Sequence, residues 1–191
     1  MIVSTYRTPR GFDDLIISSD GEALTGLWFE GSRNAPELRP DGGAREPPAL
    51  CETRRWLDAY FSGREPDFTP AYRIDGLTPF RRDVVDAMLA IPFGATATYG
   101  DIAAAIARRR GLAKMSAQAV GQAVGRNPIC LVVPCHRVVG AAGALVGYGG
   151  GLRNKVALLA LEARARREAA RVPPRVSPPG ARTSARRRSP S

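Results

Sequence analysis

Histidine and cysteine are scarce in this chain of 191 residues, which contains one histidine and three cysteines. Cys51, Cys130 and Cys135 form no Cys-x-x-Cys pair, so a zinc site would need nearly all the soft ligands to converge from distant positions. We therefore expect no metal, and no pattern in the sequence points to another cofactor. An odd, sparse set of cysteines also argues against a disulfide framework and favours a reducing compartment.

Long hydrophobic runs are absent as well. No stretch approaches the roughly 20 apolar residues that span a bilayer, and the N-terminus lacks the apolar core of a secretory signal. A composition of 44% hydrophobic and 24% charged residues is typical of one medium globular domain or two small ones. The sequence predicts a soluble, cytoplasmic protein with no membrane partner.

Acidic residues are outnumbered, since 28 lysines and arginines face 18 aspartates and glutamates and leave a formal charge of +10. Such a balance favours a polyanionic partner. Residues 171–191 hold six of the arginines and no acid, so only +4 of the charge belongs to the rest of the chain. This segment is rich in Pro, Ser and Arg and has little to bury, so we expect a disordered basic tail over 169–191.

The first part of the chain, residues 1–76, is predicted to be a small α/β domain. Alternating apolar residues flank Asp20-Gly21, a pattern typical of a β-hairpin. Residues 31–48 are rich in Gly, Pro and charge and favour a mobile surface loop. A helix should follow, ending before Gly63. Its apolar stripe consists of Trp56, Leu57, Tyr60 and Phe61.

Residues 77–168 are predicted to form a mainly helical domain. Thr78, Thr98 and Ser116 each stand where a helix N-cap is expected, and the first is followed by Pro79. The second and third helices are separated by a turn at Arg110-Gly111, which is the outline of a helix-turn-helix.

The remainder of this domain is predicted from apolar runs and glycine. The run 129–133 favours a strand, and residues 140–151 form a glycine-dense loop. A final helix should follow, containing Leu152, Val156, Leu159 and Glu162.

Cys135 is the strongest candidate nucleophile because the only histidine, His136, follows it. Side chains at consecutive positions diverge, so a bridging water is expected between them, with a distant carboxylate orienting the imidazole. The alternative is that Cys135 is a small buried apolar residue. Cys130 is open to two interpretations, core packing or a redox role beside Cys135, whereas Cys51 has no chemical neighbours.

The predicted third helix carries almost no long side chains that could read base edges. Its small residues Ala117, Gly121 and Gly125 permit two interpretations. They could form a close-packed helix crossing, or they could allow close approach to a nucleic-acid backbone.

The segments Arg126-Asn127-Pro128, Pro134-Cys135-His136-Arg137-Val138 and Gly147-Tyr148-Gly149-Gly150-Gly151, together with Lys155, carry a family resemblance. The chain closely resembles the O6-alkylguanine-DNA alkyltransferases over about residues 10–165. The resemblance implies an α+β fold: a small RNase H-like α/β N-terminal domain and a mainly helical C-terminal domain with a helix-turn-helix and the active-site cysteine. It also implies direct, cofactor-free and single-turnover repair of O6-alkylguanine, and by extension O4-alkylthymine, in double-stranded DNA, with no obligate protein partner.

The resemblance also assigns catalytic roles. Cys135 would attack the alkyl carbon on O6 of a flipped-out guanine, His136 would act as a base through water, and Glu162 would orient His136. Asn127 would brace the segment before the active site. Tyr99 would help to rotate the nucleotide and donate a proton as guanine leaves.

Substrate and DNA contacts are implied in the same way. The third helix would enter the minor groove, with Gln118 in place of the arginine that many members insert into the duplex. The carbonyls of Cys135 and Val138 would accept from the exocyclic amine, and the Gly149 N–H would face O6. The full implied set of substrate- or DNA-binding residues is Tyr99, Ser116, Ala117, Gln118, Gly121, Arg137, Val138, Tyr148, Gly149 and Lys155.

Two other classes of function remain as alternatives. One is a non-catalytic alkylated-DNA-binding or helix-turn-helix regulatory protein, against which the presence of Cys135 argues. The other is a cysteine acyl-transfer enzyme, for which no oxyanion hole can be identified.

Deletion of residues 171–191 would distinguish the two interpretations of the tail, a nonspecific DNA tether and a solvated end. If the tail contacts phosphates, its removal flattens the plot of log binding constant against log salt without abolishing methyl transfer. An unchanged slope in a salt titration of DNA binding would identify a solvated end.

Overall fold

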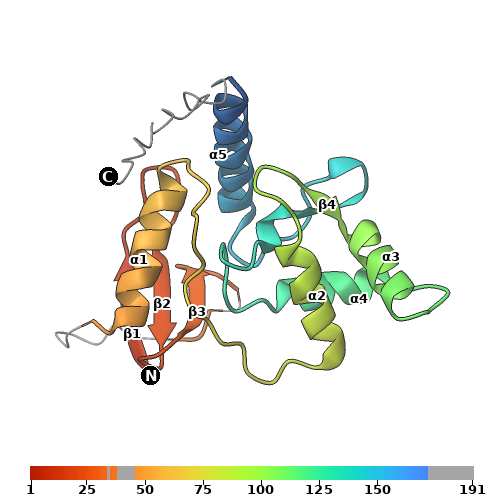
Figure 1. The fold of residues 1–191 in the computed structure, drawn as a ribbon, viewed down its shortest axis with the longest axis horizontal. Coiled ribbons are helices and arrows are strands. Elements are labelled where there is room, and N and C mark those ends of the chain that lie inside the picture. The colour runs from red at the N-terminus through yellow and green to blue at the C-terminus, as the bar shows by residue number, and fades with distance from the viewer. Residues whose placement is uncertain (34, 38–45, 172–191) are drawn as a thin grey trace, which may run out of the picture.

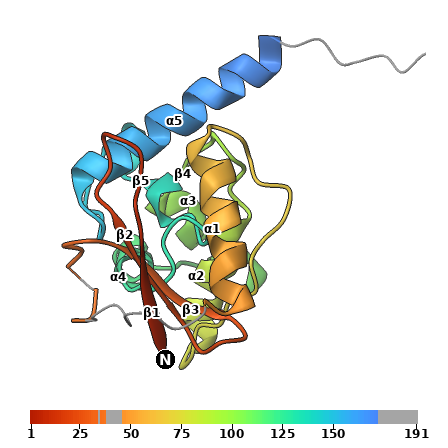
Figure 2. The same ribbon diagram turned by 90° about the vertical axis from the view of Figure 1, so that its left-hand side faces the viewer.

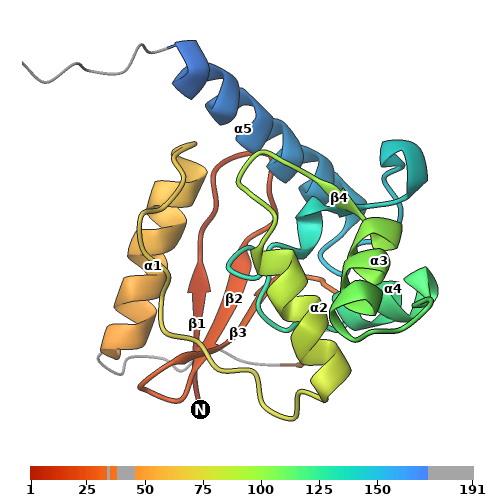
Figure 3. The ribbon, with the colours of Figure 1, turned by 45° about the vertical axis from the view of Figure 1, so that its right-hand side comes forward.

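The computed structural model describes residues 1–33, 35–37 and 46–171. A three-stranded antiparallel sheet with helix α1 alongside it forms one part of the molecule, helices α2, α3 and α4 lie together on the β3 side of that sheet, and α5 lies at one end, near both parts (Figures 1 and 3). The strands and helices are β1 (Ile2–Tyr6), β2 (Leu15–Ser19), β3 (Leu24–Phe29), α1 (Pro48–Phe61), α2 (Pro79–Leu89), β4 (Ala97–Thr98), α3 (Tyr99–Arg109), α4 (Ala117–Gly125), β5 (Val138–Val139) and α5 (Leu152–Arg171).

The predicted hairpin is confirmed as β2 and β3, which pair antiparallel around Asp20-Gly21. The carboxylate of Asp20 accepts from the N–H groups of Glu22 and Ala23, and Gly21 takes a φ of +106°, which favours glycine. Strand β1, which the sequence pattern did not reveal, pairs with the other edge of β2. Helix α1 runs beside this sheet (Figure 2). Its predicted apolar stripe is buried.

The three predicted helices after residue 77 are confirmed with their caps. Thr78 accepts from the N–H of Arg81, Thr98 forms a capping box with Asp101, and Ser116 accepts from the N–H of Ala119. The turn at Arg110-Gly111 is also present, with Gly111 at a φ of +65°.

The predicted strand over 129–133 is wrong. Only Ile129 forms a bridge, to Leu27 of β3, and the chain then turns through Leu131, whose φ is +68°. The side-chain amide of Asn127 donates to the carbonyls of Ile129 and Val133, and its oxygen accepts from the N–H of Ile129. All five residues of the run 129–133 are buried, which explains its apolar composition. Several of its backbone N–H and carbonyl groups, however, pair with the side chain of Asn127 and not with a neighbouring strand.

The predicted final helix is confirmed as α5, but two of the apolar residues named for it are exposed. Leu152 and Val156 are 48% and 46% exposed. The residues that face the interior are Asn154, Lys155, Leu158, Glu162 and Ala165. The spacing of apolar residues does not indicate this face, because three of the buried residues are polar and form internal hydrogen bonds.

Two predicted boundaries also shift. Helix α5 continues to Arg171, past the predicted start of the disordered tail at 169, and the rest of that segment lies outside the described residues. Helix α1 already begins at Pro48, the last residue of the predicted loop, of which residues 34 and 38–45 lie outside the described part. Within the described ranges, every helix is too short or too polar to cross a bilayer.

The sheet and the buried turn are joined through the backbone. The N–H of Leu27 donates to the carbonyl of Pro128 at 2.9 Å, and the N–H of Cys130 donates back to the carbonyl of Leu27 at 2.9 Å. The segment that leads to Cys135 is therefore held from one side by β3 and from the other by Asn127.

The substitution Asn127→Ala should lower the free energy of unfolding by at least about 2 kcal/mol, because it leaves buried carbonyl and N–H groups unpaired. Urea denaturation measures the effect. Gln122→Ala, at an exposed position of α4, is the matched control and should change stability by no more than about 0.5 kcal/mol. Equal effects of the two substitutions would contradict the role given to Asn127.

Candidate active site

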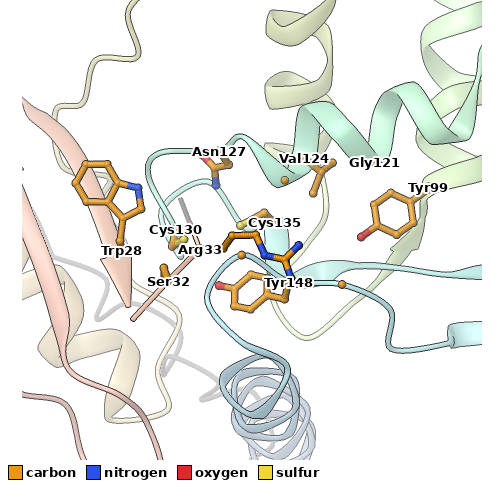
Figure 4. A pocket seen from close by; sticks show the side chains of 13 residues that line it. Trp28, Ser32, Arg33, Tyr99, Gly121, Val124, Asn127, Cys130, Cys135 and Tyr148 are labelled. Carbon is orange, nitrogen blue, oxygen red and sulfur yellow. The ribbon is translucent and has the colours of Figure 1, made fainter. Parts of the chain in front are cut away.

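A cavity of about 230 Å³ contains the sulfur of Cys135 and is walled by four separate segments (Figure 4). These segments are the chain at and after β3, helix α4 with Tyr99 beside it, the turn after α4, and the loop 147–149. The lining residues are Trp28, Ser32, Arg33, Tyr99, Gly121, Val124, Gly125, Asn127, Cys130, Cys135, Gly147, Tyr148 and Gly149. The described residues contain no cluster of His, Cys, Asp and Glu that could hold a metal ion.

Cys135 begins a single 3-10 turn, Cys135–Arg137, which follows Pro134. Its N–H donates to the carbonyl of Val133 at 2.7 Å, and its own carbonyl accepts from the N–H of Val138. The residue is only 5% exposed. A hydrogen bond from the Cys130 thiol is the largest influence on the sulfur and lowers the pKa of Cys135, against the opposing effect of burial.

The ring of His136 is completely buried, with Nε2 at 2.8 Å from Oε1 of Glu162. Burial lowers the pKa of His136, so the imidazole is neutral near pH 7. Since the ionised carboxylate of Glu162 can only accept, Nε2 must carry the ring proton. The other nitrogen, Nδ1, has no hydrogen-bond partner among the described residues and is left with a free lone pair.

Glu162 is completely buried and is surrounded by donors. Its carboxylate accepts from Tyr60 Oη at 2.8 Å, from the N–H of Gly94 at 2.8 Å and from Nε of Arg137 at 3.0 Å, in addition to His136. Burial alone would raise the pKa of Glu162, but the bonds from His136 and Arg137 lower it to about 2. The carboxylate is therefore charged at any physiological pH.

Tyr60 was missed as a site residue, because it fits the apolar stripe of α1. Its ring is completely buried, stacks on Trp56 and places its hydroxyl 3.3 Å from Nε2 of His136. Burial and the carboxylate of Glu162 raise the pKa of Tyr60, so the hydroxyl stays protonated and donates. The available signal was the hydroxyl itself, since a buried tyrosine needs a polar partner.

Arg137 and Lys155 do not line the cavity. Arg137 donates to Glu162 and to the carbonyl of Ile91 at 2.8 Å. Lys155 is completely buried and donates to the carbonyl of Val138 at 2.6 Å and to that of Gly147 at 3.4 Å. Both cations hold the site together from behind, rather than facing a bound substrate.

Tyr148, Gly149 and Val138, which are expected to contact the substrate, differ in whether they line the cavity and in which hydrogen bonds they already make. Tyr148 and Gly149 line the cavity, and Tyr148 Oη is buried without a hydrogen-bond partner in the described part of the chain. The carbonyl of Val138 already accepts from Lys155. The carbonyl of Gly149 accepts from the N–H of Arg33, which fixes the loop against the segment after β3.

Helix α4 presents an open face of small residues. Ala117 and Gly125 are exposed, so their interpretation as a close-packed helix crossing is wrong. Ser116 and Gln118 are also exposed, while Gly121 packs beside the ring of Tyr99. A surface groove runs along this face and shares Tyr99 and Gly121 with the cavity of Cys135.

Comparison with known proteins gives consistent matches. Residues 79–164 match the family model described as 6-O-methylguanine DNA methyltransferase, DNA binding domain. The chain is 43% identical over 148 residues to a methylated-DNA–protein-cysteine methyltransferase of Mycobacterium leprae, covering 78% of this chain and 85% of that protein. It is 46% identical over 162 residues to one of Mycolicibacterium paratuberculosis, covering 83% and 92%.

A solved structure of Mycobacterium tuberculosis OGT in complex with DNA has a similar fold, with a TM-score of 0.72 and 37% sequence identity. The match covers 86% of this chain and 94% of that one. With relatives this similar over most of their length, the chain belongs to the family of methylated-DNA–protein-cysteine methyltransferases.

Proposed function

We propose that the chain repairs DNA directly, by moving the alkyl group from O6 of an alkylated guanine onto Cys135. The observation that carries the proposal is the arrangement of Cys135 in a cavity, with His136 held by a buried, charged Glu162 and with no partner for its Nδ1 among the described residues. We further propose double-stranded DNA carrying the lesion as the partner, and the cytoplasm as the location.

Entry of the base requires rotation out of the duplex. Cys135 is 5% exposed, so a stacked guanine cannot reach its sulfur, and extrusion costs a few kcal/mol. The small residues of α4 let a DNA backbone approach closely, and the shared walls Tyr99 and Gly121 connect that face to the cavity. Gln118, exposed on the same face, is proposed to fill the gap left by the rotated nucleotide. DNA bound to the related OGT supports this side of the proposal.

The transfer itself is a nucleophilic displacement. A water between Nδ1 of His136 and the sulfur accepts the thiol proton, and the negative charge of Glu162 stabilises the imidazolium that forms. The thiolate of Cys135 attacks the alkyl carbon, the bond from that carbon to O6 breaks, and its electron pair stays on guanine. Tyr99 then donates a proton to the departing base, and the N–H of Gly149 faces O6. A thioether offers no good leaving group, so each molecule acts once.

Recognition of the exocyclic amine is proposed at the carbonyls of Cys135 and Val138. Each of these oxygens already accepts one hydrogen bond, from the N–H of Val138 and from Lys155 respectively. A carbonyl has two acceptor positions, so a second bond to the substrate is compatible with both. Lys155 and Arg137 are proposed to act by holding the loop and the carboxylate.

The division into domains is part of the proposal. We place an RNase H-like α/β domain at 1–76, a DNA-binding and alkyl-transfer domain at 77–168, and a basic tail after it. The contact of Tyr60 with Glu162 crosses this boundary, so the first domain contributes to the site of the second.

Transfer is tested with a duplex that contains one O6-methylguanine. Cleavage after Arg126 and Arg137 isolates a peptide, residues 127–137, that contains Cys135, and we expect it to gain a single methyl mass per molecule. Cys51→Ser should react normally and Cys135→Ser should not react. Tight binding of the lesion without a modified cysteine would instead support the non-catalytic alternative.

Glu162→Gln should slow single-turnover transfer by about 10- to 100-fold, because a neutral amide no longer stabilises the imidazolium. Tyr60→Phe, which removes one of the donors to the same carboxylate, should have a smaller effect in the same direction. Rapid-quench kinetics on the methylated duplex measures both, and gel-shift affinity for that duplex should stay nearly unchanged.

Glu168→Gln is the matched control, since Glu168 is exposed on the same helix and pairs only with Arg164 among the described residues. Its rate should equal that of the unmodified protein. A normal rate in Glu162→Gln would rule out the proposed relay.

A further inference from the structure

Two cysteines share the active-site cavity. Cys130 and Cys135 are each 5% exposed, and both line the cavity with their sulfur atoms toward it (Figure 4). The third cysteine, Cys51, is exposed on α1, and its thiol donates to the carbonyl of Glu46. The transfer proposed above uses Cys135 alone and leaves Cys130 without a role.

The backbone turns between the two cysteines. The N–H of Val133 donates to the carbonyl of Ile129 at 3.1 Å, and Leu131 takes the left-handed conformation. Asn127 fixes both ends of this turn through the carbonyls of Ile129 and Val133. Positions 130 and 135 are therefore brought to one cavity by a braced turn and not by a flexible loop.

The two sulfurs have different proton affinities. Their mutual hydrogen bond is the largest influence on each, and it raises the pKa of Cys130 while it lowers that of Cys135. Of the two thiols, Cys135 therefore loses its proton first, and Cys130 is then the neutral thiol beside the thiolate. A thiolate with a neighbouring thiol is the arrangement found in cysteines that sense oxidants reversibly.

We propose that Cys130 is a resolving cysteine, which forms a reversible disulfide with Cys135 when the protein meets a hydroperoxide. In the first step the Cys135 thiolate attacks one oxygen of hydrogen peroxide, the O–O bond breaks, and the hydroxide released takes up a proton to leave as water. In the second step the sulfur of Cys130 attacks the sulfenic sulfur of Cys135, the S–S bond forms as the S–O bond breaks, and the hydroxyl group leaves with the thiol proton as a second water. Two thiols and one peroxide thus give one disulfide and two waters, and a dithiol reductant reverses the change.

The consequence for repair rests on the proposed function. A protein that acts once has a single acceptor sulfur, and its oxidation to a sulfinic acid would be irreversible. A disulfide with Cys130 stops oxidation at a stage that thiols can reverse. While it lasts, Cys135 cannot accept an alkyl group.

Peptide mapping tests the proposal without any DNA. The full chain is treated with a small excess of hydrogen peroxide, blocked with N-ethylmaleimide and cleaved with trypsin without reduction. Both cysteines lie in one peptide, residues 127–137. The disulfide form of this peptide carries no maleimide group and is lighter by two hydrogens than the reduced, unlabelled peptide. Dithiothreitol added before blocking should restore both maleimide groups. Sulfinic acid at Cys135 with a maleimide on Cys130 would overturn the proposal.

Two variants sharpen the result. Cys51→Ser should give the same disulfide, because Cys51 lies outside the cavity. Cys130→Ala should accumulate sulfinic acid at Cys135 that dithiothreitol does not remove, and reversible oxidation in this variant would contradict the role of Cys130. The map of the unmodified protein decides the question even if Cys130→Ala fails to fold. A disulfide without alkyl transfer would leave this inference standing and count only against the proposed function.

Discussion

The buried carboxylate of Glu162 depends on donors from widely separated parts of the chain. Tyr60 comes from α1, Gly94 from the loop after α2, and His136 and Arg137 from the turn that begins with Cys135. A charge removed from water is tolerated only when it is paired and fully hydrogen-bonded. The same set of bonds that makes this charge tolerable also positions the imidazole, so stability and reactivity here rest on the same contacts.

The turn after α4 is another place where the same contacts stabilise the fold and position the site. Its residues are apolar and buried, and its backbone groups form hydrogen bonds with the side chain of Asn127 and with the backbone of Leu27 in β3. This leaves the turn short and rigid, with both Cys130 and Cys135 on the cavity wall. A strand in this place would have pointed successive side chains to opposite faces.

The cations show how poorly residue type alone indicates a contact. Arg137 lies in the motif around Cys135 and Lys155 follows the glycine-dense loop, in a protein of net positive charge. Both are used internally, one on a carboxylate and the other on backbone carbonyls. The exposed face of α4, by contrast, has small, uncharged residues where DNA is proposed to bind, so close approach counts for more there than charge.

The capped helices, the hairpin at Asp20-Gly21 and the motif around Cys135 could be predicted from the amino-acid sequence, because each depends on a few consecutive residues and on local hydrogen bonds. Three features became visible only in the folded chain: the contact of Tyr60 with Glu162, the burial of Lys155 on α5 where Val156 is exposed, and the turn at residues 129–133. The first two features depend on partners far away in the chain, and the turn combines nearby Asn127 with distant Leu27. A local apolar pattern reports that a residue is buried, but not which distant polar group will satisfy it.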